Sequence, residues 1–190
     1  MVGDPADLLV WIDTETTGLD PLTVQVLELG LIVTDLDLVP LHVFEVVIHH
    51  DTITYESELV RKMHQDSGLH ALIMEGQGLP MGHAEEAALN FIHKHVPKGA
   101  APMCGSSVQF DRLMMEKHAP RLHGWFHYRN IDTSSIKETC RRYNPRVYAA
   151  LETHTAPAKL HRVIPDLGDT LNEYAFYLDN FLFVDPEVLA

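Results

Sequence analysis

Asp13 and Glu15 interrupt an apolar run near the start of the chain, and a Thr-Thr-Gly turn follows them at once. If residues 8–15 form a buried strand, the alternation of side chains along a strand places both carboxylates on one face. Two carboxylates at such short range repel each other unless a positive charge lies between them, and their hard oxygen atoms favour Mg²⁺ or Mn²⁺ over Zn²⁺. The pair therefore indicates either a metal site or a strand end that simply reaches solvent.

Three later residues could complete a metal site. Asp111 follows a Gly-Ser turn at the start of an expected helix, and ligands of α/β proteins gather at such strand ends. An acidic residue in the first turn of a helix is also favourable without any metal. His161 and Asp166 form a His-x-x-x-x-Asp motif where an irregular stretch meets the last expected helix. A carboxylate fixed on a helix suits a metal ligand, whereas a histidine on a more mobile segment suits a general base.

Together these residues match the requirements of two-metal phosphodiester hydrolysis. In that chemistry two cations ~3.5–4 Å apart clamp the attacking and leaving oxygens of an in-line displacement. The sequence therefore predicts two Mg²⁺ or Mn²⁺ ions held by four carboxylates, with a histidine that deprotonates the attacking water. The predicted catalytic residues are Asp13, Glu15, Asp111, His161 and Asp166.

The elements that would position these residues begin with three strands. They are expected at residues 8–15, 26–34 and 41–49, and the connections between them are short enough for antiparallel hairpins. Helices are expected at residues 56–63, 69–75 and 82–95. The last of these has its apolar residues at helical spacing and ends at a Pro-Lys-Gly stop.

Strands and helices then alternate. Strands are expected at 101–105 and 127–132, helices at 108–118, 134–142 and 166–182, and an irregular stretch at 145–159. Ser134 or Thr133 is expected to cap its helix, and Pro165 lies at the first turn of the last one. Antiparallel hairpins followed by strand-helix units predict a mixed five-stranded sheet flanked by helices, the ribonuclease-H-like α/β fold, in one domain over residues 1–190.

Composition limits the partners. The chain is 46% hydrophobic and 22% charged, as in ordinary soluble proteins, and it shows neither a membrane-length apolar run nor a secretion signal. The two cysteines are isolated, which predicts the reducing cytoplasm. A net charge of −13 argues against binding long nucleic acid through many phosphates. It leaves room for a short phosphate-containing substrate held by metals and one or two arginines.

Three motifs also carry a family resemblance. They are Trp-Ile-Asp-Thr-Glu-Thr-Thr-Gly-Leu from residue 11, Gly-Ser-Ser-x-x-x-Asp from residue 105, and the late His-x-x-x-x-Asp. Their order and spacing resemble the exonuclease motifs of the DEDD superfamily, histidine subtype, over nearly the whole chain. Within that superfamily the segment His-Tyr-Arg-Asn-Ile-Asp-Thr-Ser-Ser-Ile-Lys-Glu, residues 127–138, resembles the oligoribonucleases most.

The resemblance implies a homodimeric 3′→5′ exoribonuclease that degrades very short 5′-phosphorylated RNA, down to dinucleotides, to 5′-mononucleotides. By position, the four acidic residues of the motifs would be metal ligands and His161 the general base. Other residues would bind substrate. Leu19 would wedge against the bases, and Tyr128 would contribute across the dimer. The 5′ phosphate would be capped by Ser107, Arg129 and Ser134.

Several alternatives remain open. Tyr128 could be an ordinary core or dimer aromatic, and Ser134 a helix cap that never meets substrate. Thr16 stands where oligoribonucleases usually have Met, and Leu59 where a base-stacking Trp is common. Because Asp-Thr-Glu-Thr-Thr-Gly is the spelling of proofreading subunits and ribonuclease T, a DNA-directed or RNA-trimming exonuclease is the nearest rival. A non-catalytic nucleotide-binding module is a rival from another class.

Overall fold

The structure is a computed structural model, and it describes residues 7–152 and 160–182. Its centre is a five-stranded sheet in the order β3-β2-β1-β4-β5. β1 pairs antiparallel with β2 and β2 with β3, whereas β4 and β5 run parallel to β1. The strands are β1 (Leu9–Thr16), β2 (Val26–Thr34), β3 (Pro40–Val47), β4 (Met103–Gly105) and β5 (Asn130–Asp132). The predicted mixed sheet and its two antiparallel hairpins are confirmed.

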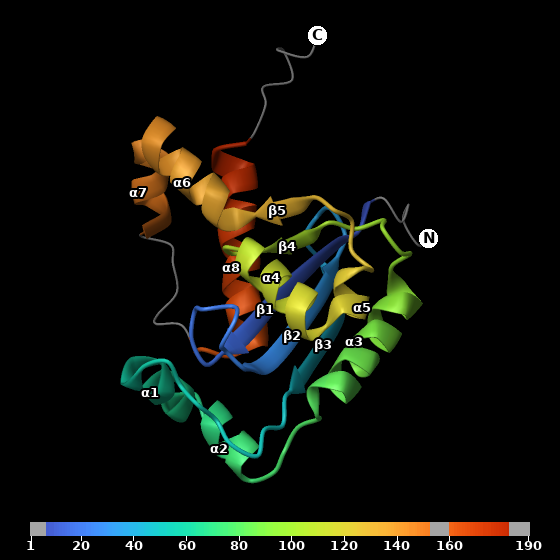
Figure 1. Ribbon diagram of the computed structural model, residues 1–190. Coiled ribbons are helices and arrows are strands. Elements are labelled where there is room, and N and C mark those ends of the chain that lie inside the picture. The colour runs from blue at the N-terminus through green and yellow to red at the C-terminus, as the bar shows by residue number, and fades with distance from the viewer. Residues whose placement is uncertain (1–6, 153–159, 183–190) are drawn as a thin grey trace.

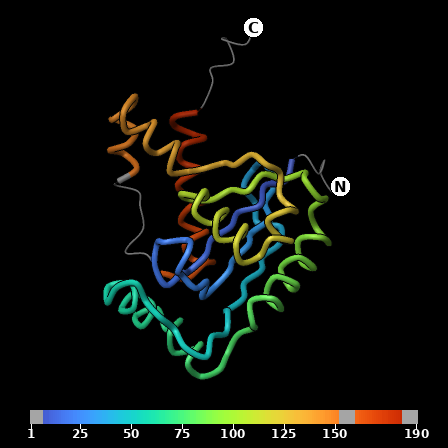
Figure 2. The backbone as a smooth tube through the Cα atoms, viewed as in Figure 1, coloured from blue at the N-terminus to red at the C-terminus, as the bar shows by residue number. Residues whose placement is uncertain are grey.

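Helices cover both faces of this sheet (Figure 1). They are α1 (Glu58–Asp66), α2 (Leu69–Met74), α3 (Met81–His95), α4 (Gln109–His118), α5 (Pro120–His123), α6 (Thr133–Tyr143), α7 (Pro145–Glu152) and α8 (Val163–Asn180). α3, α4 and α5 pack on one face and α8 on the other. Figure 2 shows the chain leaving β3, passing through α1 and α2 beyond the end of the sheet, and returning through α3.

The alternation of side chains in β1 assigns each residue to one of these faces. Val10 and Ile12 belong to the core on the α3–α5 side. Leu9 and Trp11 belong to the smaller core under α8. The same period of two carries Asp13 and Glu15 onto the α8 face. Both line one cavity together with Asp166 of α8, which confirms the predicted shared face.

Gly30 in β2 allows α8 to approach this face closely. It is paired with Asp13 in the sheet. A Cβ atom at residue 30 would overlap the side chain of Val163, the first residue of α8. The absence of a side chain at Gly30 thus lets the start of α8 lie directly against the end of β1.

Three details of the secondary structure differ from the prediction. α5 was not expected, and α7 occupies the first half of the stretch predicted to be irregular, whose residues 153–159 lie outside the described part of the chain. α7 exists because Leu151 packs against Cys140 and Tyr177 of its neighbours, a tertiary contact that local pattern does not show. The prediction that Ser134 or Thr133 caps α6 was also wrong, because the N-cap is Asp132, which accepts a hydrogen bond from the backbone N–H of Ser134.

No helix within residues 7–152 and 160–182 is both long enough and apolar enough to cross a membrane.

Candidate active site

The end of β1 is where helices from both faces of the sheet meet. Asp13 and Glu15 point toward α8, whereas the side chain between them, Thr14, points toward α4. The Thr14 hydroxyl donates a 2.7 Å hydrogen bond to Oδ1 of Asp111, in the first turn of α4. One short stretch of strand therefore draws together acidic residues that are about a hundred positions apart in the chain.

A cavity of about 250 Å³ opens at this point. Its lining includes three carboxylates and, among the described residues, no lysine or arginine, so a cation is the natural occupant. The lining residues are Asp13, Thr14, Glu15, Thr16, Gly18, Leu19, Val60, Met63, His64, Phe110, His161 and Asp166. Asp13, Glu15, Leu19, His161 and Asp166 were predicted from the sequence, and the structure brings them around one space.

Glu15, His161 and Asp166 form a compact group. One ligand atom from each lies within 4.8 Å of the other two. Asp166 is buried in the first turn of α8, where the helix dipole favours negative charge. The two carboxylates suit a hard divalent cation such as Mg²⁺ or Mn²⁺, and the imidazole lies beside them, where a general base could reach a water molecule.

Asp111 is not an ordinary acidic residue on a helix surface. It is only 4% exposed. Burial and then the negative charge of Asp13 raise the pKa of Asp111 well above its usual range, and the hydrogen bond from Thr14 opposes this rise. Helix-dipole stabilisation alone does not require such burial. The ionised form needs a positive partner here, as a bound cation would provide.

The backbone around His161 is held in an uncommon conformation. His161 has φ +52°, in the left-handed region that costs a non-glycine residue about 1–2 kcal/mol. The next residue secures it, because Arg162 Nε lies 2.9–3.0 Å from both carboxylate oxygens of Glu28 in β2. The backbone N–H of Val163 donates to the same carboxylate at 3.2 Å. Glu28 thereby fixes the segment that carries the histidine.

His64 is a residue of the site that the sequence did not reveal. Its side chain is 1% exposed and lines the cavity. Its Nε2 lies 3.0 Å from the Thr16 carbonyl oxygen, which can only accept, and its Nδ1 lies 3.7 Å from Glu15 Oε2. Burial is the main cause that lowers the pKa of His64. One histidine among 13 on a mostly polar helix gave no signal in the sequence.

The predicted phosphate-binding serines lie together, but outside the cavity lining. Ser107 Oγ and Ser134 Oγ are 3.1 Å apart, and Ser106 Oγ lies 2.9 Å from Ser134 Oγ. Asp132 holds the pair by accepting hydrogen bonds from the backbone N–H groups of Ser107 and Ser134. Because Asp132 is the cap of α6, the Ser134 hydroxyl is not used for capping.

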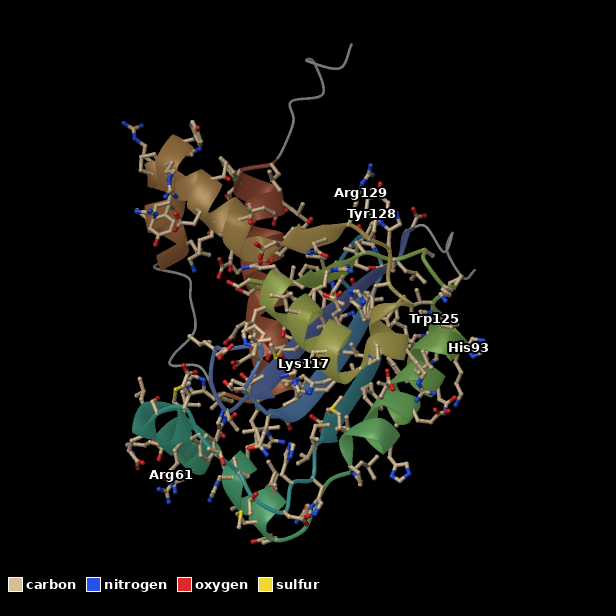
Figure 3. The ribbon with its side chains drawn as sticks, in the orientation of Figure 1. Arg61, His93, Lys117, Trp125, Tyr128 and Arg129 are labelled. Atoms are coloured by element: carbon tan, nitrogen blue, oxygen red, sulfur yellow. The ribbon has the colours of Figure 1, made fainter. Side chains whose placement is uncertain are left out.

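Tyr128 and Arg129 lie elsewhere. Figure 3 shows both side chains at the outer edge of the molecule, far from Arg61 on α1. Tyr128 is 74% exposed, so it is not a core aromatic, and the Arg129 guanidinium lies 5.3 Å from the centre of its ring. Within the described chain, no hydrogen bond joins the Arg129 side chain to Ser107 or Ser134. Of the predicted phosphate cap, the two serines therefore lie together, whereas Arg129 contacts the Tyr128 ring instead.

A larger cavity, about 740 Å³, does not compete for the catalytic role. It is lined by residues 51–58 and by side chains from α1 and α2, and it lacks the convergence of Asp13, Glu15 and Asp166 that marks the smaller cavity. Chemistry is assigned to the smaller cavity because charge and ligand geometry, not volume, identify it.

Comparison with known proteins defines the class first. Residues 10–174 match the family model described as "Exonuclease". The chain is therefore a nuclease, and the alternative of a non-catalytic nucleotide-binding module is rejected.

Close relatives give the family. The oligoribonuclease of Aromatoleum aromaticum is 34% identical over 181 residues, covering 94% of this chain and 96% of the relative. That of Pseudomonas aeruginosa is 36% identical over 177 residues, covering 92% and 96%. The chain belongs to the oligoribonuclease family, and the resemblance found in its motifs is confirmed.

Solved structures support the fold. Exonuclease I of E. coli, in complex with a dT13 oligonucleotide, matches 96% of this chain with a TM-score of 0.72 at 13% identity. Exonuclease I of Methylocaldum szegediense matches 92% with a TM-score of 0.69 at 16% identity. The chain spans only 42% and 41% of those two proteins. At this identity the likeness confirms the predicted ribonuclease-H-like fold and nothing about substrate.

Proposed function

We propose that this exoribonuclease removes nucleotides from the 3′ end of very short, 5′-phosphorylated RNA, down to dinucleotides, and releases 5′-mononucleotides. The observation that carries the proposal is the convergence of Asp13, Glu15, His161 and Asp166 around one small acidic cavity in a chain of the oligoribonuclease family. Residues 1–190 would act as one exonuclease domain.

Four carboxylates are proposed to hold two Mg²⁺ or Mn²⁺ ions. Asp111 and Asp166 are buried, and the charge of Asp13 raises the pKa of Asp111. Asp13, Glu15 and Asp166 line a cavity that has no lysine or arginine among the described residues, which supports this role. When bound, two such ions supply the positive charge that stabilises the attacking and leaving oxygens of an in-line displacement. The ligands would be Asp13, Glu15, Asp111 and Asp166.

His161 is proposed as the general base. It takes a proton from the attacking water as the water oxygen bonds to phosphorus, and the bond from phosphorus to the 3′ oxygen of the preceding nucleotide breaks. The released 3′ oxygen then takes a proton from solvent. Replacement of His161 by Ala should slow hydrolysis by the ~10²–10⁴-fold typical of a general base, and an unchanged rate would place the base elsewhere.

Substrate binding is proposed to use two groups of residues. Leu19 is 75% exposed at the mouth of the cavity, which suits a wedge against bases. The hydroxyls of Ser107 and Ser134 offer hydrogen bonds to a terminal phosphate, and an arginine can grip that phosphate with two parallel hydrogen bonds. Arg129 would have to leave the Tyr128 ring to join them.

The protein is proposed to form a homodimer in which Tyr128 contributes to the site of the second copy. Its ring is exposed and directed away from the body of its own chain, so it could reach a site on a second copy (Figure 3). Sedimentation equilibrium should give twice the mass of the 21.4 kDa chain, whereas a monomer at all concentrations would contradict this part of the proposal. A cytoplasmic location is proposed because both cysteines are free and buried.

Product analysis tests the proposal. A 5′-labelled triribonucleotide incubated with Mn²⁺ should yield first a labelled dinucleotide and then a labelled mononucleotide, with unlabelled 5′-mononucleotides released at each step. A substrate whose 3′ end is blocked by phosphate is the control. The rival function, a DNA-directed or RNA-trimming exonuclease, is suggested by the Thr-Thr-Gly sequence that begins at Thr16. The Thr16 hydroxyl, however, donates a 2.7 Å hydrogen bond to the Gly18 carbonyl oxygen, so it has a structural role within the turn. Faster cleavage of the matched DNA would overturn the RNA assignment.

A further inference from the structure

The turn that carries Leu19 is tied to the segment before α1 by one residue, Glu56. Oε2 of Glu56 accepts a 2.5 Å hydrogen bond from the backbone N–H of Leu19. The backbone N–H of Glu56 donates to the Thr17 carbonyl oxygen at 2.8 Å. Glu56 therefore grips the turn from both sides of Gly18, once through its side chain and once through its backbone.

Gly18 makes this grip possible. A Cβ atom at residue 18 would overlap the Glu56 side chain, including its carboxylate oxygen. The carboxylate thus lies directly against the backbone of the turn. A hydrogen bond to an ionised acceptor at such short range is among the strong ones in proteins.

The far side of the same turn is held by a cation. Lys117 of α4, labelled in Figure 3, donates to the carbonyl oxygens of Pro21 at 2.8 Å and Leu22 at 2.6 Å. The turn is anchored at both ends, and among residues 7–152 and 160–182 Glu56 is the one whose side chain bonds to Leu19 itself. Because the Leu19 side chain is 75% exposed, little packing fixes its place, so its backbone decides where it points.

We propose that Glu56 is a positioning residue for substrate. It orients the backbone of Leu19 so that the leucine side chain stands over the mouth of the cavity, and it thereby sets how tightly the bases of a short RNA are held. Glu56 lines the larger cavity and not the acidic one, so its effect on the bound RNA is proposed to pass through Leu19. This inference rests on the proposed function, in which Leu19 wedges against bases.

A double-mutant cycle on a 5′-phosphorylated diribonucleotide tests the inference. Glu56→Ala should lower kcat/KM by about 10-fold, the scale of one hydrogen bond to a charged group, mainly by raising KM. Glu56→Gln keeps an acceptor oxygen and should restore kcat/KM to within about 3-fold of the wild type. Glu56→Asp withdraws its carboxylate by one methylene and should resemble the alanine variant. In a Leu19→Ala background, Glu56→Ala should have no further effect.

Glu58→Ala is the matched control, because Glu58 is an exposed carboxylate two residues away whose ion-pair partner is Arg61 at 3.6 Å. Its kinetics should equal those of the wild type. The inference is overturned if Glu56→Ala leaves KM unchanged or costs as much without Leu19 as with it. If the alanine variant fails to fold, the Gln and Asp variants decide between the same outcomes. Failure of the wild-type enzyme to cleave short RNA would instead overturn the proposed function.

Discussion

Asp111 and Asp13 lie close enough for their charges to interact, in surroundings that disfavour two negative charges. Asp111 is buried, and the charge of Asp13 adds to burial in raising its pKa. Such an arrangement weakens the folded protein unless a cation compensates it. Residue-scale tests should therefore separate the contribution of each carboxylate to activity from its contribution to stability.

Asp13→Asn should lose activity without losing the fold. The substitution keeps the side-chain volume but removes the negative charge of one proposed metal ligand, the charge that also repels Asp111. Hydrolysis should fall at least ~10²-fold, since even residues that only orient metal ligands contribute up to about that factor. The melting temperature in EDTA should be equal or higher, as circular dichroism would show. Cleavage at the wild-type rate would refute the assignment of Asp13 to the metal site.

Metal removal should affect stability more as the pH rises. Because the folded pKa of Asp111 lies above its unfolded value, the metal-free protein loses stability as the pH rises through that folded pKa. A cation binds the ionised carboxylate, so its stabilising effect grows over the same range. Melting temperatures with Mn²⁺ and with EDTA should differ more at about pH 8 than at about pH 5. An equal difference at both pH values would contradict the raised pKa.

At the scale of elements, α8 and β2 are joined by a buried ion pair. Arg162 precedes α8, and its partner Glu28 in β2 is 1% exposed, whereas Arg162 is 27% exposed. The pair holds the segment between His161, the proposed general base, and Asp166, a proposed metal ligand. Its loss should therefore affect both stability and rate.

Arg162→Ala would leave the Glu28 carboxylate buried without its cation. Breaking a buried pair in this way costs about 3–5 kcal/mol, and the partial exposure of Arg162 favours the lower end. Urea unfolding should show a loss of about 3 kcal/mol. The control is Arg61→Ala, which breaks an exposed pair with Glu58 and should cost less than ~1 kcal/mol. Equal losses in the two variants would show that the buried pair has no special role.

The elements that could be predicted are those with a local signal. β1 and β2 follow from their apolar patterns, and the shared face of Asp13 and Glu15 follows from the period of a strand. Contacts between distant parts of the chain could not be predicted. The pair of Arg162 with Glu28 spans 134 residues, and His64 of α1 contacts the carbonyl oxygen of Thr16, which lies 48 residues earlier at the end of β1.

On the scale of the whole molecule, acidity and a small cavity point to the same substrate class. A net charge of −13 does not suit a protein that follows a long polyanion, and a cavity of about 250 Å³ at the end of one strand leaves little room for many nucleotides. Two divalent cations would compensate the charge locally, where the scissile phosphate lies. Selectivity for short RNA is therefore the central claim.

Turnover of a length series tests that claim most directly. 5′-phosphorylated oligoribonucleotides from two to about ten residues would be compared at equal concentration with Mn²⁺, and kcat/KM would be measured for each. The dinucleotide should have the highest kcat/KM, with a steady fall as the chain lengthens. Equal or faster turnover of the longest strand would contradict the account.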